Sequence, residues 1–204
     1  MKIVRASLFV IFVAAPCLCT TIVVFWTPTS TVLGTDAKIR FGNGKPAGST
    51  CKIGVSKNIL WAHAGILGFR DSPAAIHNIL TEELNSSGAL DSRISSAESR
   101  ISAVLFSFFN LPPVKPAVLA HPDKNQVQFV VIAFENGTTR MVVRSFMPRK
   151  GASENVEIDI IRDSCPEGCG SRRYEGLGFH DEADRILKTT AQYGIGAPRT
   201  LSNT

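Results

Sequence analysis

The chain has 204 residues, of which 44% are hydrophobic and 19% are charged, and its formal net charge is +5. This is the balance of a globular protein, and the length suits one sizeable domain or two small ones. The basic residues are scattered, without a block of positive charge or interleaved aromatic residues. That pattern indicates an ordinary solvated surface and argues against nucleic-acid binding.

The first predicted element is a secretory signal peptide over residues 1–19. Lys2 and Arg5 supply its positive start, and the run ASLFVIFVAA supplies a short apolar core. That core is too short to span the roughly 30 Å of a bilayer comfortably, and no later segment is long and apolar enough to cross one. We therefore expect a secreted or periplasmic protein that has no membrane anchor once the signal is removed.

The position of the signal cleavage decides which residue begins the mature chain. Small residues in Pro-Cys-Leu-Cys favour a cut between Cys19 and Thr20. A cut after Ala15 and an uncut leader are the alternatives. The favoured cut leaves residues 20–204, which we expect to form a single domain.

The beginning of this domain is expected to be a meander of β-strands. Its segments are rich in β-branched residues and are separated by turns of Pro, Ser, Thr and Gly. The expected strands cover residues 20–26, 31–41, 49–56 and 58–69, with a glycine-rich hairpin at 42–48.

In the middle of the chain the pattern changes to helical spacing. Apolar residues recur every three or four positions through two expected helices, at 71–84 and 90–111. Strands return on either side of Asn136-Gly137, which is the strongest short hairpin signal in the chain. A further strand is expected at 155–163 and a last helix at 178–192.

The expected order is thus four strands, two helices, three strands and a helix, with no internal repeat and no long linker. Strands that flank a helical pair favour an α+β fold in which two antiparallel sheets lie between helix layers. The sequence therefore predicts a four-layer αββα sandwich. The order of elements alone leaves other α+β folds open.

Five cysteines lie at positions 17, 19, 51, 165 and 169, and three of them remain after the favoured cut. Cys165 and Cys169 bracket a tight Pro/Gly turn, so they can close a small disulfide loop in an oxidising compartment. A zinc site needs four ligands, and three cysteines with four scattered histidines offer no recognisable set. We expect no metal and no cofactor.

The segment TTIVVFWTPTSTVLGTDAK, which begins at Thr20, resembles the opening strand and turn of the β-type proteasome subunits, in the N-terminal-nucleophile (Ntn) hydrolase superfamily. Asp36 lies 16 residues and Lys52 lies 32 residues after Thr20, and both spacings match the family's catalytic threonine, aspartate and lysine. The Ala-Gly pair ending at Gly65 resembles the start of the family's oxyanion region. It falls one residue early, so the amide of Gly65 or of the next residue would serve. The resemblance covers about the first ninety residues.

The chemistry explains why these residue types are needed together. A threonine hydroxyl is a weak nucleophile and needs a base, which a free N-terminal amine on Thr20 would supply because its pKa lies close to neutral. A charged Lys52 beside the hydroxyl would lower the hydroxyl's pKa, and Asp36 would pair with that lysine. A backbone N–H near Gly65 would receive the developing oxyanion.

The chain also departs from the family pattern. Cys19 stands where the family has a self-cleaved glycine, so we expect signal peptidase to expose Thr20. The family's supporting serine and its later Asp-x-x-Ser are not at their expected positions. The nearest candidates are Ser145, Ser153, Asp163 and Ser164.

The resemblance implies a threonine-type hydrolase that cleaves peptide or other amide bonds through an acyl-enzyme on Thr20. Proteasome subunits form rings, so a homo-oligomer is one implied assembly. A non-catalytic exported binding or scaffold domain and a small-molecule amidase stay open as alternatives. His63, which lies beside Ala64, is interpreted as a structural strand histidine.

Overall fold

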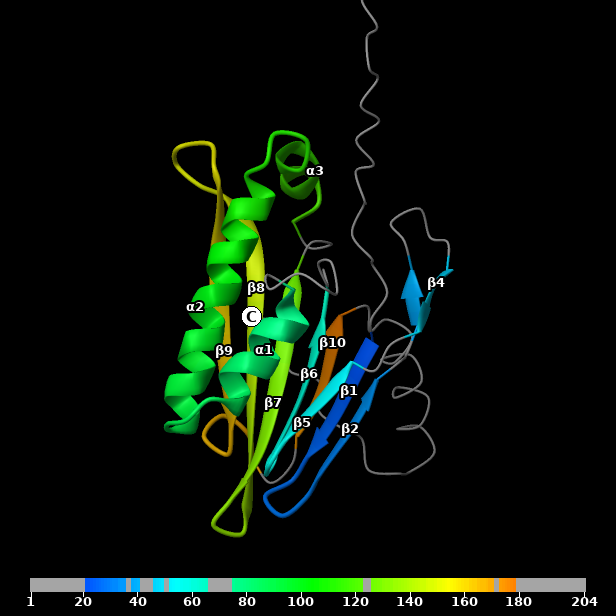
Figure 1. Cartoon of the computed structure of the whole chain (residues 1–204), viewed down its shortest axis with the longest axis vertical. Helices are drawn as coiled ribbons and strands as arrows, with labels where there is room; N and C mark the ends of the chain where they lie inside the picture. The colour runs from blue at the N-terminus through cyan, green and yellow to red at the C-terminus, as the bar shows by residue number, and fades with distance from the viewer. Residues whose placement is uncertain are drawn as a thin grey trace, which may run out of the picture.

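The computed structural model describes residues 21–35, 38–40, 46–49, 52–65, 75–122, 126–170 and 173–178. In these ranges the strands are β1 (Thr21–Trp26), β2 (Thr31–Thr35), β3 (Lys38–Arg40), β4 (Pro46–Ser49), β5 (Ile53–Ser56), β6 (Ile59–Ala64), β7 (Val127–Glu135), β8 (Thr138–Lys150), β9 (Val156–Cys165) and β10 (Arg173–Gly178). The helices are α1 (Ile76–Asn85), α2 (Leu90–Phe109) and α3 (Lys115–Ala120). Figure 1 shows their arrangement.

All the strand pairs are antiparallel. Within the described residues, five strands form a sheet in the order β5-β6-β7-β8-β9, three form a sheet in the order β10-β1-β2, and β3 pairs with β4. The β7–β8 hairpin turns at Asn136 and Gly137, whose φ angles are 52° and 78°. Two consecutive positive φ angles are what a tight hairpin turn requires, so this prediction is confirmed.

The five-stranded sheet is buried on both faces, and β7 shows why. Phe129 and Val131 belong to an apolar cluster with α1 and α2, whereas Val130 and Ile132 belong to a second cluster with β1 and β10. Successive side chains of a strand point to opposite faces, so a nearly continuous apolar run can fill two cores at once.

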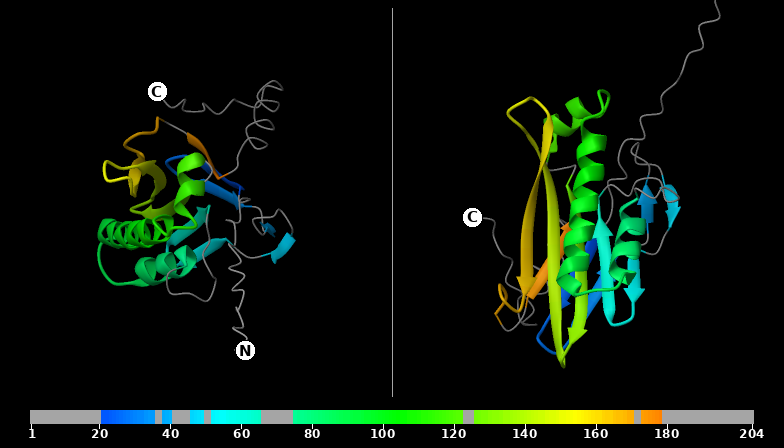
Figure 2. Two further views of the ribbon diagram at one scale, coloured as in Figure 1. Left: turned by 90° about the horizontal axis from the view of Figure 1, so that it is seen from above. Right: turned by 60° about the vertical axis from the view of Figure 1, so that its left-hand side comes forward.

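Three layers follow from these two clusters. Helices α1 and α2 cover one face of the five-stranded sheet, and the three-stranded sheet covers the other, as Figures 1 and 2 show. The long helix α2 contributes a stripe at helical spacing, which consists of Ile94, Ala97, Ile101 and Leu105. The α+β class with antiparallel sheets is therefore confirmed. The second helix layer would have to come from the expected helix at 178–192, which lies outside the described residues except for its first position.

Several expected elements need correction. Gly178 ends strand β10 instead of beginning a helix, because β10 pairs with β1 along six residues and Gly178 lies opposite Thr21. The expected strand at 31–41 is divided, because 31–35 pairs with β1 and 38–40 pairs with β4. The short helix α3 lies in a segment for which no element was predicted.

Candidate functional site

The turns that follow β1, β5 and β7 all lie at the same end of the two packed sheets. The Trp26 indole nitrogen donates to the Thr139 carbonyl oxygen over 3.0 Å, which places the last residue of β1 beside the β7–β8 hairpin. The Phe134 amide donates to the Asn58 carbonyl oxygen over 3.2 Å, so the turn between β5 and β6 lies at this end as well. Strand β1 therefore runs away from the turns and begins at the opposite end.

That opposite end, the upper one in Figure 1, carries the start of β1 and the end of β2. Ile22 pairs with Thr35, so β1 begins where β2 ends. Asp36 follows Thr35 directly and Thr20 lies two residues before Ile22, and both lie outside the described residues.

Lys52 and Gly65 lie at this same end of the five-stranded sheet. Lys52 immediately precedes β5, and Gly65 immediately follows β6. These two strands run antiparallel from the Lys57-Asn58 turn, so their outer ends are neighbours. Of the four expected catalytic residues, the structure thus describes two and brings both to one end of the sandwich.

Lys52 is almost completely buried, with 1% of its surface exposed. Enclosing an ammonium group in a protein costs several kcal/mol unless polar or charged groups compensate it. Lys52 takes part in polar or electrostatic interactions within the protein and is not an isolated charge. Because it is buried, Lys52 is not an ordinary solvated surface lysine.

Gly65 has a φ of +101°, which side chains rarely permit. A Cβ there would lie 2.5 Å from the carbonyl oxygen of Gln126 and 3.0 Å from the Cα of Val127. Backbone strain and close approach to the start of β7 thus both require glycine. This requirement comes from the fold and holds with or without an oxyanion nearby.

His63 is a buried member of an aromatic cluster with Trp61 and His77, and Lys52 is close enough to influence its pKa. Its ring centroid is 6.2 Å from that of Trp61 and 5.8 Å from that of His77 on α1. Burial lowers the pKa of His63 to about 3, and positive charge on His77 and on Lys52 lowers it further. The imidazole is therefore neutral at physiological pH, and its Nδ1 finds no hydrogen-bond partner among the described residues.

A second buried polar pair faces the space between the sheets. The Gln128 amide nitrogen donates to the Ser145 hydroxyl over 3.0 Å, and the two side chains are 8% and 7% exposed. Gln128 pairs with Ala64 in the adjacent strand, so this pair lies near the outer end of β6. Ser145, one of the four candidates for a supporting residue, pairs with Gln128. Gln128 in turn pairs with Ala64, the residue before Gly65.

Asp163 and Ser164 lie elsewhere. Asp163 forms an ion pair with Arg173, the strand partner of Trp26, which places it toward the end that carries the turns. The Ser164 amide donates to the Asp163 carboxylate over 2.9 Å. Ser153 is exposed in the turn between β8 and β9. None of these three takes part in the Lys52 region.

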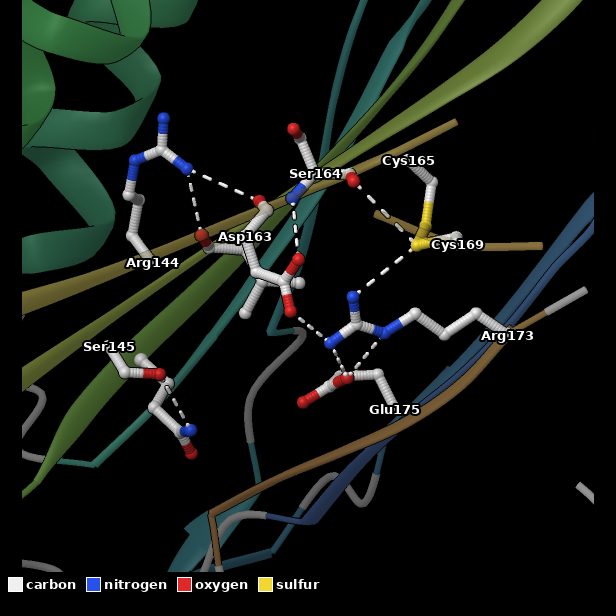
Figure 3. Close-up of polar contacts among 10 residues, drawn as sticks. Arg144, Ser145, Asp163, Ser164, Cys165, Cys169, Arg173 and Glu175 are labelled. Atoms are coloured by element: carbon white, nitrogen blue, oxygen red, sulfur yellow. Dashed lines mark hydrogen bonds and ion pairs between the residues drawn. A yellow bond between two sulfur atoms is a disulfide. The ribbon is translucent and has the colours of Figure 1, made fainter. Parts of the chain in front are cut away.

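Figure 3 shows what the Asp163 region does instead. The buried Arg173 guanidinium lies between Asp163 and Glu175 and donates to the Cys169 sulfur over 3.3 Å. Cys165 and Cys169 form a disulfide with a Cα–Cα distance of 5.2 Å, which agrees with the expected loop. This network joins β9 to β10 and is structural.

A shallow groove between α2 and β9 is separate from the candidate site. It is lined by side chains that include Ser102, Phe106, Ile158 and Ile160. At its edge the Glu98 carboxylate binds Arg144 over 2.9 Å and also binds Arg162. Two strands separate β9 from β6, so the groove does not reach Lys52 or Gly65.

The proximity of Lys52 to His63 was readable from the sequence but was not predicted. With the turn at Lys57-Asn58, Ile53 pairs with Ala62. Lys52 and His63 are the residues next to this pair, just beyond the ladder. The predicted hairpin therefore already contained this signal, because directly opposite residues share a face of the sheet.

No model of a known protein family matches the chain, and no curated protein sequence matches it. Among the helices in the described ranges, none combines the length and apolar character needed to cross a membrane.

Proposed function

We propose that the protein is an exported threonine-type Ntn hydrolase of the proteasome-like kind, with Thr20 as its nucleophile after removal of residues 1–19. One observation carries the proposal. One end of the two packed sheets holds the start of β1 and the end of β2, together with the buried Lys52 and the constrained Gly65. The spacing of Thr20, Asp36, Lys52 and Gly65 along the sequence is the second support for the proposal.

In the proposed mechanism the free amine of Thr20 accepts the proton of its own hydroxyl, directly or through a water. The oxygen attacks the substrate carbonyl carbon, and a backbone N–H near Gly65 stabilises the oxyanion. The amine then gives its proton to the leaving amine, which leaves an acyl-enzyme ester. Water attacks this ester, the product acid departs, and the hydroxyl is restored.

Burial of Lys52 supports its proposed part. A positive charge held away from water interacts more strongly with a developing alkoxide than a solvated one does. Asp36, which follows β2 along the chain, is the carboxylate proposed to orient it. The substrate is a peptide or another amide, and neither step uses a metal or cofactor.

The finer fold proposal is the complete αββα sandwich. Phe25 of β1 pairs with Val32 of β2 on the outer face of the three-stranded sheet. The described residues leave these two apolar side chains 38% and 65% exposed. The rest of the expected helix, residues 179–192, follows β10 directly along the chain. We propose that it covers this apolar face as the fourth layer.

The decisive experiment exploits the free amine. The N-terminus of the exported protein is sequenced first, and Thr-Thr-Ile-Val is expected. Chains beginning at Thr20, and chains with one alanine added before Thr20, are then compared on a panel of peptides and small amides. The extra residue keeps the hydroxyl and removes the adjacent amine, so activity should be lost in that chain and in Thr20→Ala. Thr20→Ser should retain part of it.

The same panel separates the alternatives. Cleavage of small amides alone would identify an amidase instead of a peptidase. An active chain with the added alanine would refute the amine-base mechanism. A different native N-terminus, or a folded Thr20 chain that cleaves nothing and is not acylated by a β-lactone probe, would favour the non-catalytic binding domain. Ring assembly is a further proposal, tested by the molar mass in solution.

A further inference from the structure

Strand β9 is an edge of the five-stranded sheet, and no strand in the described ranges pairs with its outer side, as Figure 2 shows. Its ladder with β8 continues along all 10 residues of the strand without a register shift. The free N–H and C=O groups of an edge attract further strands, so most edges are protected by proline, lysine, a bulge or unpaired charge. Strand β9 has no proline, no lysine and no bulge.

A hydrogen bond at the β8–β9 turn shows which backbone groups of β9 face outward. The Gly151 amide donates to the Asn155 carbonyl oxygen over 2.8 Å, so these two residues form a hydrogen-bonded pair. In an antiparallel ladder, hydrogen-bonded and non-hydrogen-bonded pairs alternate. Val156, the next residue, therefore turns its N–H and C=O away from β8, and every second residue after it does the same.

Both ends of this outward row have hydrogen-bond partners within the chain. The side chain of Asn110, which follows α2, accepts from the Val156 amide and donates to the Val156 carbonyl oxygen, each over 2.9 Å. At the other end the Ser164 amide donates to the Asp163 carboxylate over 2.9 Å. The Ser164 carbonyl oxygen accepts from the Gly168 amide over 2.9 Å. The two ends of the edge are thus closed to a further strand.

The outward residues between these closed ends are Ile158, Ile160 and Arg162. In the part of the chain that the structure describes, no hydrogen bond reaches their outward N–H and C=O groups. The three residues are symmetric about Ile160. A second β9, related by a two-fold axis at Ile160, would place Ile160 opposite itself and Ile158 opposite Arg162. All the open backbone groups of both strands would then be paired, and the closed ends would stay outside the contact.

The charges of β9 favour a copy of the same strand over an acidic or basic partner. Every charged side chain of the strand forms an ion pair within its own chain: Glu157 and Asp159 with Arg149, Arg162 with Glu98, and Asp163 with Arg173. The edge therefore presents no uncompensated charge that would repel a second edge or attract a charged peptide. Two such edges are complementary in charge, because both are neutral.

Helix α2 also leaves room for its counterpart. Glu98 of α2 binds Arg162. Asn110 binds Val156, so the middle of this helix segment runs beside Ile160. The helix residues that line the groove there are small, with one aromatic exception: Ser99, Ser102, Ala103, Phe106 and Ser107. Small side chains allow two helices to approach closely, and the contact would cover Phe106, which is 45% exposed.

We propose that the protein forms a two-fold dimer in which β9 of one copy pairs with β9 of a second copy about Ile160, so that two five-stranded sheets become one continuous sheet. The two copies of α2 then lie side by side on one face of that sheet. The contact closes on itself with two copies, whereas a ring needs a different, heterologous contact. It uses no residue of the candidate site and is independent of the proposed function.

The first test is the molar mass of the exported chain in solution. Sedimentation from about 10 μM to about 1 mM covers weak and intermediate dimers. The wild type should be a dimer. Ser102→Glu sets two carboxylates near each other across the axis and should give monomers. Val55→Glu adds the same charge on β5, at the opposite edge of the sheet where the side chain is 68% exposed, and should remain a dimer. A dimer that Ser102→Glu leaves intact would overturn the proposal. A monomeric wild type would also overturn it, and would leave the edge to an extended segment of another protein.

The second test fixes the register and decides the matter if Ser102→Glu does not fold. Ile160→Cys sets two thiols opposite each other at the axis, with Cα atoms about 5.5 Å apart, which a disulfide can span. In Ile158→Cys the two thiols are displaced by about 14 Å along the strands, which a disulfide cannot span. Oxidised glutathione should therefore crosslink Ile160→Cys into a covalent dimer and leave Ile158→Cys unlinked. The wild type, whose own cysteines are present in both variants, gives the background. Equal crosslinking of the two variants, or none in Ile160→Cys, would refute the pairing about Ile160.

Discussion

Replacing Gly65 by alanine tests the geometry at the end of β6, and the chain provides a matched control. Gly88 has a φ of +118°, close to the +101° of Gly65, but among the described residues no heavy atom lies within 4 Å of a Cβ built there. Gly88→Ala therefore carries only the conformational cost of an alanine in this region, about 1–2 kcal/mol. Gly65→Ala carries the same cost and also forces a methyl group against the Gln126 carbonyl oxygen at 2.5 Å.

That contact is with backbone, which cannot turn away as a flexible side chain would. Overpacking of this kind typically costs about 1–3 kcal/mol, so Gly65→Ala should lose about 2–5 kcal/mol in all. Urea unfolding of both variants, at equal slopes, measures the difference in the free energy of unfolding. Equal losses in the two variants would refute the close approach of β6 to β7. In the folded variant, the displaced backbone should also lower kcat.

Three further predictions concern buried groups. Burial lowers the pKa of His63 from 6.5 to about 3, so below pH 6.5 the unfolded chain binds a proton that the folded chain does not. The free energy of unfolding should therefore fall by about 1.4 kcal/mol for each unit by which the pH is lowered from 6.5 toward 3. Urea unfolding of His63→Gln should show a shallower slope with pH over this window, and an unchanged slope would contradict the neutral buried ring. Serine at both Cys165 and Cys169 should lose about 2 kcal/mol, the chain entropy of so short a loop. Reducing the disulfide of the wild type should lower its stability by the same amount. If the double serine variant is destabilised and the reduced wild type is not, the effect comes from packing and not from the disulfide. Arg173→Met leaves two part-buried carboxylates facing each other and should lose about 2–4 kcal/mol, whereas Arg149→Met, at an exposed ion pair, should lose less than about 1 kcal/mol. Thermal unfolding of the two variants side by side checks this, and similar losses would contradict a structural role for Arg173.

The elements that were predicted correctly have local causes. Asn136-Gly137 forms its hairpin because these two residues tolerate positive φ angles. The apolar stripe of α2 follows helical spacing, and β1 consists largely of β-branched and aromatic residues. In each case the decisive interaction lies within a few residues along the chain.

Strand β10 was missed because its cause is distant. Its sequence, RYEGLG, contains two glycines and little β-branched character, so nothing local favours a strand. It becomes one by pairing with β1, about 150 residues earlier in the chain, between Thr21 and Trp26. The same pairing explains why Gly178 belongs to a strand and not to the expected helix.

The candidate site divides in the same way. By itself the sequence determined the residue types, their spacing from Thr20 and the turn at Lys57-Asn58 that joins β5 to β6. Only the tertiary structure decided that Lys52 and His63 are both buried, that His77 of α1 closes over the ring, and that Asp163 belongs to Arg173 instead of the site. Spacing along a strand follows from covalent geometry, whereas burial and charge pairing depend on which distant elements pack together, and that depends on the whole chain.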